Sequence, residues 1–405
     1  MGILSDYDTL REVTKNLSPP FMVVDLDTFD ANARDLAGKA RAHGKKLRLA
    51  SKSIRVPALI KRLFEIDPET FQGIMCFSAA EARFLSDEGL DDFLVAYPSI
   101  VEKETAEAIA VAKSGKTITL MVDSPYQVDA IDAQVRATSP ELKLELCIDA
   151  DMSLRRLGGL VHLGVQRSPI RSMQDFQALA EHIQTRDNVK LAGVMGYESQ
   201  VAGLPDKNPF APMQNFVKAR VRRLSVKNCR RIRGEIADYL KANAIQIRFF
   251  NGGGTGSMAW TPTEPWLTEV TAGSGFLQPH LFDYYSEGHA KPAYCFALPI
   301  SRFSAPDYLT VKSGGFIASG ESSQDKAPIV HLPKGLETIS AEGFGEVQTP
   351  LKNKSNVSTG LLGPIFFRPS KGGEIAERFN SYYLIEGGKV VEEVPTYRGL
   401  GQVFY

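Results

Sequence analysis

A lysine and two glycine-rich stretches are the residues of this chain whose types and spacing could do chemistry together. Lys52 directly follows the apolar run 46–51, where a buried strand would end. A lysine that points from a strand end into a barrel mouth would be desolvated, which lowers the pKa of its amine and suits it to form a Schiff base. The stretches 251–257 and 273–275 let backbone N–H groups approach an anion closely, and Thr255 adds a hydroxyl donor. This combination predicts a phosphorylated aldehyde as the ligand.

Two further groups of polar residues follow apolar runs. Asp149 and Asp151 come after one such run and are followed by an arginine-rich turn at 155–158, although a solvated ion pair in a loop is an equally good interpretation. Tyr197 and Gln200 follow the next run. They would place an aromatic ring and an amide at the same mouth, although most tyrosines serve in core packing.

Eight short apolar or β-branched runs are the elements that must position these groups. They lie at 46–51, 74–79, 93–98, 117–123, 142–150, 191–198, 246–254 and 267–275. Segments with a 3.6-residue apolar rhythm separate most of the runs, which is typical of intervening helices. An open doubly wound sheet would give the same local alternation, so the count of eight decides for a (β/α)8 TIM barrel. Phosphate sites in such barrels form after strands seven and eight, where both glycine-rich stretches fall.

The pattern changes after residue 290, where short strand-like runs separated by turn residues replace the helical rhythm. We therefore predict an α/β protein in which a TIM barrel is followed by a C-terminal all-β domain. The barrel would occupy residues 25–289 and the β domain residues 290–405. The N-terminal segment 1–24 is expected to pack with the β domain.

Pyridoxal 5'-phosphate satisfies both demands of the site, because it is a phosphorylated aldehyde that enzymes hold through a lysine. A class I aldolase acting on a sugar phosphate would also need a lysine and a phosphate site. Its lysine usually lies on a later strand, however, and it needs no second domain. Pyridoxal phosphate is therefore the predicted cofactor of the barrel.

The sequence resembles the fold-type III pyridoxal-phosphate enzymes, which include alanine racemase and the eukaryotic-type ornithine decarboxylases. Within that group it is most similar to the D-threonine aldolase and D-serine dehydratase branch. The resemblance runs from about Pro20 to Tyr397. It is carried by PPFMVVDLDTFDANA near the N-terminus, RLASKS around Lys52, RRLG at 155–158, NGGGTGS, AGSG, and GEVQTPL at 345–351.

The resemblance implies roles for individual residues. Lys52 matches the lysine that holds the cofactor as an internal aldimine, and Arg156 looks like the arginine near the cofactor's phenolic oxygen. Tyr197 and Gln200 would line the substrate side, with Tyr197 also against the cofactor. The residues that would hold the phosphate are Gly253, Gly254, Thr255, Gly273 and Ser274.

The resemblance leaves the partner of the cofactor's pyridine nitrogen open between two residues of the last barrel run. Glu269 is an acid on that run, but Thr271 stands two residues before the loop glycine, where relatives place an arginine or a glutamate. With Thr271 at the site, the ring nitrogen would lack a strong proton partner. That would favour chemistry that does not require a long-lived quinonoid.

The sequence departs from its relatives late in the β domain. D-threonine aldolases and their dehydratase relatives hold a metal there through a His-x-Asp or His-x-Cys pair, and the metal binds the substrate's β-hydroxyl. Pro369 stands where that histidine is expected, and His331 is the only histidine after residue 290. We therefore assign no metal ligand, although a carboxylate-only metal site is an alternative. The residues that would position the substrate instead, unless they form a solvated turn, are Arg368, Lys371 and Glu374.

The resemblance implies a lyase that acts on a β-hydroxy-α-amino acid, by retro-aldol cleavage or by dehydration and deamination. An amino-acid racemase or epimerase is an alternative, with Lys52 on one face and Tyr284, Tyr285 or a tyrosine of a partner subunit on the other. A third is a pyridoxal-phosphate carrier without turnover. The β domain argues against it, because such carriers are usually a bare barrel.

Composition and charge limit the partners. The 47 basic and 47 acidic side chains cancel, which argues against a nucleic-acid surface. The chain contains no apolar run of 18 residues, and its polar, acidic start is unlike a signal peptide. Its four cysteines form no CxxC pair, which fits a reduced compartment. We expect a cytoplasmic protein that binds a small amino-acid substrate, with no nucleic acid and no membrane partner. The resemblance implies a homodimer, in which the β domain of one subunit covers the barrel mouth of the next.

Overall fold

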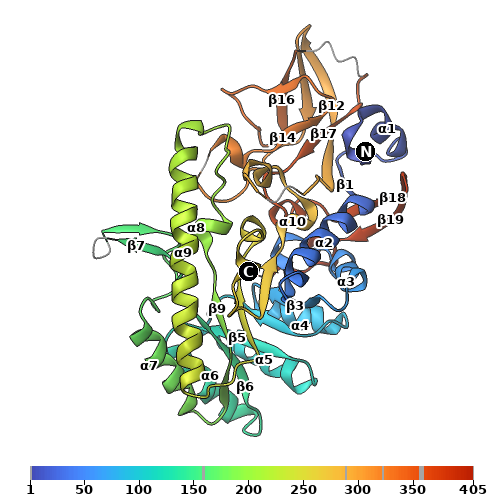
Figure 1. Cartoon of the computed structure of the whole chain (residues 1–405). Coiled ribbons are helices and arrows are strands. Elements are labelled where there is room, and N and C mark those ends of the chain that lie inside the picture. Colours follow the sequence, from blue (N-terminus) through green and yellow to red (C-terminus); the bar gives the residue numbers. More distant parts are fainter. Residues whose placement is uncertain (1, 157–159, 288–289, 322, 355–359, 405) are drawn as a thin grey trace.

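A computed structural model describes residues 2–156, 160–287, 290–321, 323–354 and 360–404. A closed barrel of eight parallel strands lies at its centre (Figure 1), and the last strand pairs with the first. In barrel order the strands are β2 (Lys46–Ala50), β3 (Phe71–Cys76), β4 (Phe93–Val95), β5 (Ile118–Val122), β6 (Leu144–Asp149), β9 (Val189–Gly196), β10 (Phe249–Gly252) and β11 (Glu269–Ala272). Each predicted strand is present, so the predicted TIM barrel is confirmed.

Helices connect and surround the barrel strands. They are α2 (Leu26–Arg41), α3 (Pro57–Ile66), α4 (Ala79–Asp87), α5 (Glu102–Lys113), α6 (Pro125–Thr138), α7 (Met173–Gln184), the short α8 (Ser199–Ala202), α9 (Pro212–Ala242) and the short α10 (Ser274–Leu277). Several begin where a serine follows a strand. The N-cap of α4, α6 and α7 is a serine whose side chain accepts a backbone N–H from the first turn of the helix. These serines are Ser78, Ser124 and Ser172.

The inside of the barrel is filled by side chains from alternate strand positions, as expected for two-residue periodicity. One apolar layer contains Met121, Cys147, Met195 and Phe249, together with residues of β4. A buried ion pair between Arg48 and Glu269 lies deeper in the barrel. The barrel is therefore a packed core, and only its rim is open for chemistry.

A nine-stranded sheet forms the second part of the fold and confirms the strand-rich C-terminal region. Its strands are β1 (Phe21–Asp25), β12 (Tyr294–Ala305), β13 (Tyr308–Lys312), β14 (Ile329–Leu332), β15 (Leu336–Thr338), β16 (Gln348–Asn353), β17 (Pro364–Arg368), β18 (Ser381–Glu386) and β19 (Lys389–Pro395), with the short helix α11 (Gly373–Ala376). Strand β1 lies between β12 and β18. Helix α1 (Tyr7–Val13) packs on the same sheet, where the Tyr7 hydroxyl donates to the Pro364 carbonyl over 3.1 Å.

Two features depart from a plain barrel (Figure 1). A hairpin of β7 (Leu154–Arg156) and β8 (Val161–Leu163) projects from the side of the molecule, and the 31-residue helix α9 runs along the barrel toward the second sheet. Within the described ranges, no helix is both long and apolar enough to cross a membrane.

Candidate active site

Lys52 lies at the carboxyl end of the first barrel strand, in a short 3-10 turn (Ser51–Ser53) that directly follows β2. Its Nζ donates a hydrogen bond to the hydroxyl of Tyr97 over 2.8 Å. The Lys52 side chain is exposed, so the burial that the sequence led us to expect is wrong for the chain in this structure. Tyr97 was not predicted as a site residue, although it follows β4 and therefore stands at the same barrel rim.

The two glycine-rich loops meet beside Lys52. The hydroxyl of Thr255, in the first loop, accepts the N–H groups of Gly275 over 3.0 Å and of Gly273 over 3.4 Å in the second. A Cβ placed on Gly273 would lie 2.8 Å from the Ser53 hydroxyl, so only glycine lets this loop come so close to the lysine's neighbour. These contacts bring the two loops together, and their binding of a phosphate stays a prediction.

Glu198 holds the first glycine loop in place. Its carboxylate accepts the N–H of Gly253 over 3.1 Å and the hydroxyl of Ser257 over 2.8 Å, as well as the hydroxyl of Thr261. Gly253 has a φ of +93°, a backbone conformation that favours glycine. The N–H of Gly254 in turn donates to the Ser257 hydroxyl over 3.1 Å. Gly253 and Gly254 therefore shape the loop with N–H groups that are already engaged.

Other N–H groups of the loops remain available for an anion. Those of Thr255, Gly256 and Ser274 have no acceptor among the described residues, and all three residues are partly exposed. They lie at the starts of two short helical turns, which are joined where the Thr255 hydroxyl accepts the N–H groups of Gly273 and Gly275. The Thr255 hydroxyl lies beside these N–H donors, and there is no room for a side chain at Gly273. A group of donors of this kind fits a phosphate group.

A buried ion triad supports Glu198 from behind. Arg233, on α9, is fully buried and donates to Glu198, to the Gly196 carbonyl over 2.6 Å and to Glu264 over 2.6 Å. Burial opposes ionisation of Glu198, but Arg233 and the two hydroxyl donors outweigh it and leave the pKa of this carboxyl below its usual value. Glu198 is therefore a charged, fixed acceptor. Neither Glu198 nor Arg233 was predicted as a site residue.

The two residues proposed to face the cofactor's ring nitrogen have different surroundings in the structure. Glu269 is buried and bound to Arg48 Nε over 2.7 Å, so its charge is already balanced inside the barrel. Thr271 lies two residues closer to the rim, and its hydroxyl accepts the amide of Asn251 over 2.8 Å. Thr271 with Asn251 is therefore the better-placed candidate, and both are neutral hydrogen-bonding groups.

Tyr197 and Gln200 lie on the rim after β9 but differ in their surroundings. The ring of Tyr197 is next to Gly254, where a Cβ would come within 3.3 Å of it, and burial raises the pKa of its phenol to about 12. Gln200 donates to the Met152 carbonyl over 2.6 Å, and its amide oxygen is buried without a partner in the described part of the chain. Tyr197 therefore borders the first glycine loop, whereas a substrate contact of Gln200 stays a prediction.

Two arginines are candidates for the residue near the cofactor's phenolic oxygen, the role that the resemblance gave to Arg156. Arg156 ends β7 in the projecting hairpin, and its side chain lies outside the described residues. Arg167 follows the hairpin in a loop that is hydrogen-bonded to the last residue of β6 and to the chain just after β9. Val165 donates to the Ser199 hydroxyl over 3.1 Å, and the Ser168 hydroxyl donates to the Asp149 carbonyl over 2.6 Å. Arg167 is thus held at the barrel rim, which the motif at 155–158 did not indicate.

The segment that replaces the relatives' metal pair packs directly on the lysine turn. A Cβ on Gly373 would lie 1.6 Å from the Lys52 carbonyl oxygen, so helix α11, which follows β17 of the second sheet, reaches the barrel rim of the same chain. Arg368 forms a bidentate pair with Asp283 over 2.5 and 2.9 Å. Lys371 donates to the Ser319 carbonyl over 2.8 Å, and Glu374 accepts the Ser319 N–H over 2.6 Å.

These donors do not fit a divalent cation, because two of the charged side chains are cations and the third is committed to Ser319. Pro369 offers only its carbonyl, which accepts the His280 N–H over 3.1 Å. Among the described residues, no cluster of three or more His, Cys, Asp or Glu side chains is arranged to hold a metal.

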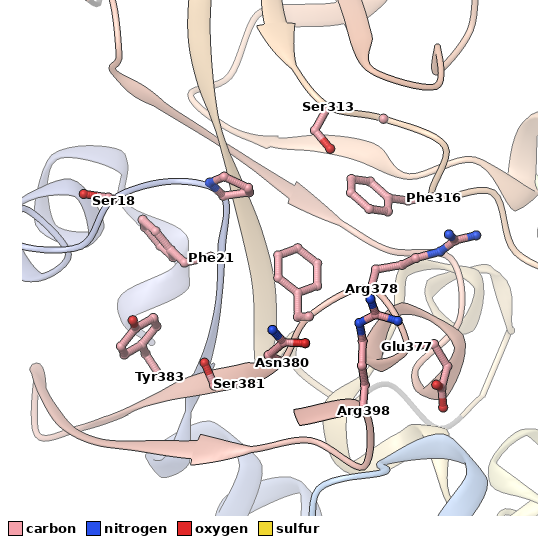
Figure 2. A pocket seen from close by; sticks show the side chains of 13 residues that line it. Ser18, Phe21, Ser313, Phe316, Glu377, Arg378, Asn380, Ser381, Tyr383 and Arg398 are labelled. Atoms are coloured by element: carbon pink, nitrogen blue, oxygen red, sulfur yellow. The ribbon is translucent and has the colours of Figure 1, made fainter. Parts of the chain in front are cut away.

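A separate cavity of about 540 Å³ lies in the second sheet (Figure 2). Residues that line it include Phe21, Phe316, Arg378, Tyr383 and Arg398. Glu377, also in its lining, pairs with Arg55 over 2.5 Å, and Arg55 donates to the Lys52 carbonyl over 3.2 Å. The cavity therefore lies behind the backbone of the lysine turn, and it contains none of the predicted site residues.

Comparisons with known proteins identify similar sequences. A family model described as "Alanine racemase, N-terminal domain" matches residues 24–276. A 3-hydroxy-D-aspartate aldolase from Paracoccus denitrificans (strain Pd 1222) is 21% identical over 258 residues, which cover 64% of this chain and 60% of that protein. A D-threonine aldolase from Arthrobacter sp is 23% identical over 256 residues, which cover 63% of this chain and 60% of that protein. The matches thus span 60% of the length of these relatives.

The fold also matches solved structures. The crystal structure of a D-threonine aldolase from Filomicrobium marinum superposes with a TM-score of 0.79 and covers 95% of this chain and 96% of that one. The sequence identity is 17%, so this likeness shows a shared fold.

Proposed function

The chain belongs to the alanine racemase N-terminal domain family, and on that premise we propose that it is a pyridoxal-phosphate-dependent lyase acting on β-hydroxy-α-amino acids. The relatives are named as aldolases of D-threonine and 3-hydroxy-D-aspartate, and both of these amino acids carry a β-hydroxyl. We propose aldol cleavage, with dehydration as the alternative within the same class. The observation that carries the proposal is the contact of the two glycine loops with each other and with Ser53, which directly follows Lys52 at the barrel rim.

The rim residues fit pyridoxal 5'-phosphate. Lys52 supplies the amine for its aldehyde, and the loop N–H groups, together with Thr255 and Ser274, would hold its phosphate. Thr271 would face the ring nitrogen, and either Arg156 or Arg167 the phenolic oxygen. When bound, the cofactor supplies an electron sink for the bond that breaks at the substrate's Cα.

The chain's own groups would then orient the substrate and move its protons. The Tyr97 hydroxyl holds the Lys52 amine at the rim, where a freed amine can carry a proton to or from Cα. The raised pKa of Tyr197 keeps its phenol protonated near neutral pH, so it serves as a hydrogen-bond donor. The loop at 372–373 covers the backbone of Lys52 and shields that side from water.

Lys52→Ala tests the cofactor assignment. We expect the variant to fold and to lose the visible absorbance of lysine-bound pyridoxal phosphate, whereas Lys45→Ala, a control on the loop before the same strand, keeps it. Full retention of the band in Lys52→Ala would overturn the proposal. Release of an aldehyde from a panel of D- and L-β-hydroxy amino acids by the unmodified protein tests the reaction.

A racemase is the second candidate, and deuterated water separates the two. α-Deuteration with loss of optical activity, and no release of aldehyde or keto acid, would identify a racemase. The tyrosines considered for its second base have engaged hydroxyls. Tyr285 donates to the Ala202 carbonyl over 2.8 Å, and Tyr284 is 3.1 Å from Nδ1 of His280.

We also propose that the protein is a cytoplasmic homodimer. The start of α9 exposes Met213 (94%), Phe216 (77%) and Val217 (60%), which supports a contact with a second copy. The four cysteines are free and buried, which supports a reducing compartment. Met213→Glu with Phe216→Glu should halve the mass in sedimentation velocity, and an unchanged mass would contradict this interface.

A further inference from the structure

Asp149 presents a carboxyl group at the barrel rim that the proposed function has not used. It is the last residue of β6, and two residues earlier Cys147 belongs to the apolar layer inside the barrel. Because side chains alternate along a strand, the Asp149 carboxyl faces the same interior, one step closer to the opening. Its own backbone carbonyl is fixed by the Ser168 hydroxyl over 2.6 Å.

The position of Asp149 is opposite that of Lys52. The barrel order places β2 and β6 four strands apart in either direction, so the two strands stand on opposite walls. Lys52 follows the end of β2, and Asp149 ends β6. A ligand bound at the mouth would therefore have an amine on one side and this carboxyl on the other.

Asp149 differs from its acidic neighbours because its carboxyl has no hydrogen bond or ion pair with any described residue. Asp123 receives the amide of Gln127 over 2.9 Å, and Asp151 receives the hydroxyl of Ser153 over 2.6 Å. Two of the three acids are thus committed to local structure. Asp149 alone is available to a ligand.

The charges around Asp149 prepare it to exchange a proton near neutral pH. Burial raises the pKa of Asp149 to about 7, the charges of Asp123 and Asp151 add to this rise, and Arg167 opposes it. The thiol of Cys147 lies below it and is kept neutral, because burial raises the pKa of that thiol well above its usual value. A carboxyl with these neighbours can accept a proton from a substrate and release it again.

We propose that Asp149 is a catalytic residue that accepts the proton of the substrate's β-hydroxyl. This assignment rests on the proposed aldol cleavage. Residues 367–374 do not fit a metal that would bind the β-hydroxyl, and Asp149 gives that hydroxyl a proton acceptor. As the O–H bond breaks, its electron pair forms the carbonyl of the departing aldehyde. The Cα–Cβ electron pair stays with Cα, which takes a proton from Lys52, and the proton on Asp149 returns to Lys52 through solvent.

Asp149→Asn and the matched control Asp151→Asn test this role in the cofactor-loaded protein. Cleavage of D-threonine and 3-hydroxy-D-aspartate is measured as aldehyde release. Exchange of the α-hydrogen of glycine in deuterated water reports the chemistry at Cα without a β-hydroxyl. We expect Asp149→Asn to lower kcat for cleavage about 10²–10⁴-fold, while glycine exchange and the cofactor's absorbance stay within about threefold of the unmodified protein.

The control and the pH profile sharpen the test. Asp151→Asn should change cleavage by less than about fivefold, because that carboxyl serves its own loop. The fall of kcat/KM below pH 7 should disappear in Asp149→Asn and remain in Asp151→Asn. Should Asn disturb folding, seen as loss of cofactor absorbance, Asp149→Ser is the second variant with the same expectation.

Several outcomes would overturn the assignment. Cleavage at the unmodified rate in Asp149→Asn would do so, and so would an equal loss of glycine exchange, which would place Asp149 at Cα. Loss in Asp149→Asn of a stoichiometric divalent cation that cleavage requires would make it a metal ligand instead. If the unmodified protein exchanges glycine but cleaves neither hydroxy amino acid, the proposed function itself fails, and the Asp149 assignment falls with it.

Discussion

Arg233 is shared by two buried carboxylates, and only one of them also holds a glycine loop. Both Glu198 and Glu264 pair with Arg233, but Glu198 additionally accepts the Gly253 N–H and the hydroxyls of Ser257 and Thr261. Removing one partner of a buried ion pair typically costs about 3–5 kcal/mol of unfolding free energy. We therefore expect Glu198→Ala and Glu264→Ala each to lose about that much stability.

The two variants should differ in cofactor affinity. Glu198→Ala releases the first glycine loop, which would hold the cofactor's phosphate. One or two hydrogen bonds that order this loop are then lost, at about 1 kcal/mol each. That loss corresponds to roughly 5- to 30-fold weaker cofactor binding. Glu264→Ala leaves those bonds in place, so its affinity should stay within about threefold of the unmodified value.

Urea unfolding of the cofactor-free proteins measures stability, and titration of the visible absorbance with pyridoxal phosphate measures affinity. Equal losses of affinity in the two variants would refute the reasoning, because the loss would then follow stability and not the loop. Unchanged affinity in Glu198→Ala would refute it as well. Glu198→Gln, which keeps an oxygen acceptor, serves as a milder variant if Glu198→Ala does not fold.

Three further predictions test other parts of the site. Gly273→Ala should weaken cofactor binding at least about tenfold in an absorbance titration, because its Cβ would lie 2.8 Å from the Ser53 hydroxyl; unchanged binding would contradict the close approach of the loop. Tyr97→Phe should lower the cleavage rate about 10-fold or more with little change in stability, since it removes the hydrogen bond to Lys52. Burial raises the pKa of Glu81 to about 7, so the folded state binds this proton more tightly than the unfolded state and loses stability as pH rises through 5 to 7. Glu81→Gln should reduce that decline in urea unfolding at pH 5 and pH 8, with the part due to Asp149 remaining; an unchanged decline would show that Glu81 is not its source.

The fold and the place of the glycine loops could be predicted because their signals are local. Each barrel strand is a short apolar run that ends in small or polar residues, and Lys52 and the glycine loops directly follow such runs. Arg233 carries no comparable signal. It stands 35 residues from Glu198, and its partners are fixed only by how α9 lies against the barrel.

One error and two ambiguities have similar physical causes. The expected burial of Lys52 depended on what would cover the rim, and the end of a strand does not specify that. Arg155 and Arg156 end a strand of a projecting hairpin, and the chain after that hairpin brings Arg167 to the rim as a second candidate for the same role. The choice between Glu269 and Thr271 required strand register, which shows that Glu269 is already paired with Arg48.

Strand β1 has a consequence for the order in which the molecule is synthesised. It precedes the barrel along the chain, yet its neighbours β12 and β18 are translated only after the whole barrel. The second sheet therefore cannot close until β18 has been translated, and Gly373 of helix α11, which lies between β17 and β18 in the chain, packs against the Lys52 carbonyl. The surroundings of the lysine turn are thus completed after the barrel, so a chain that stops at the end of the barrel would lack a completed reaction centre.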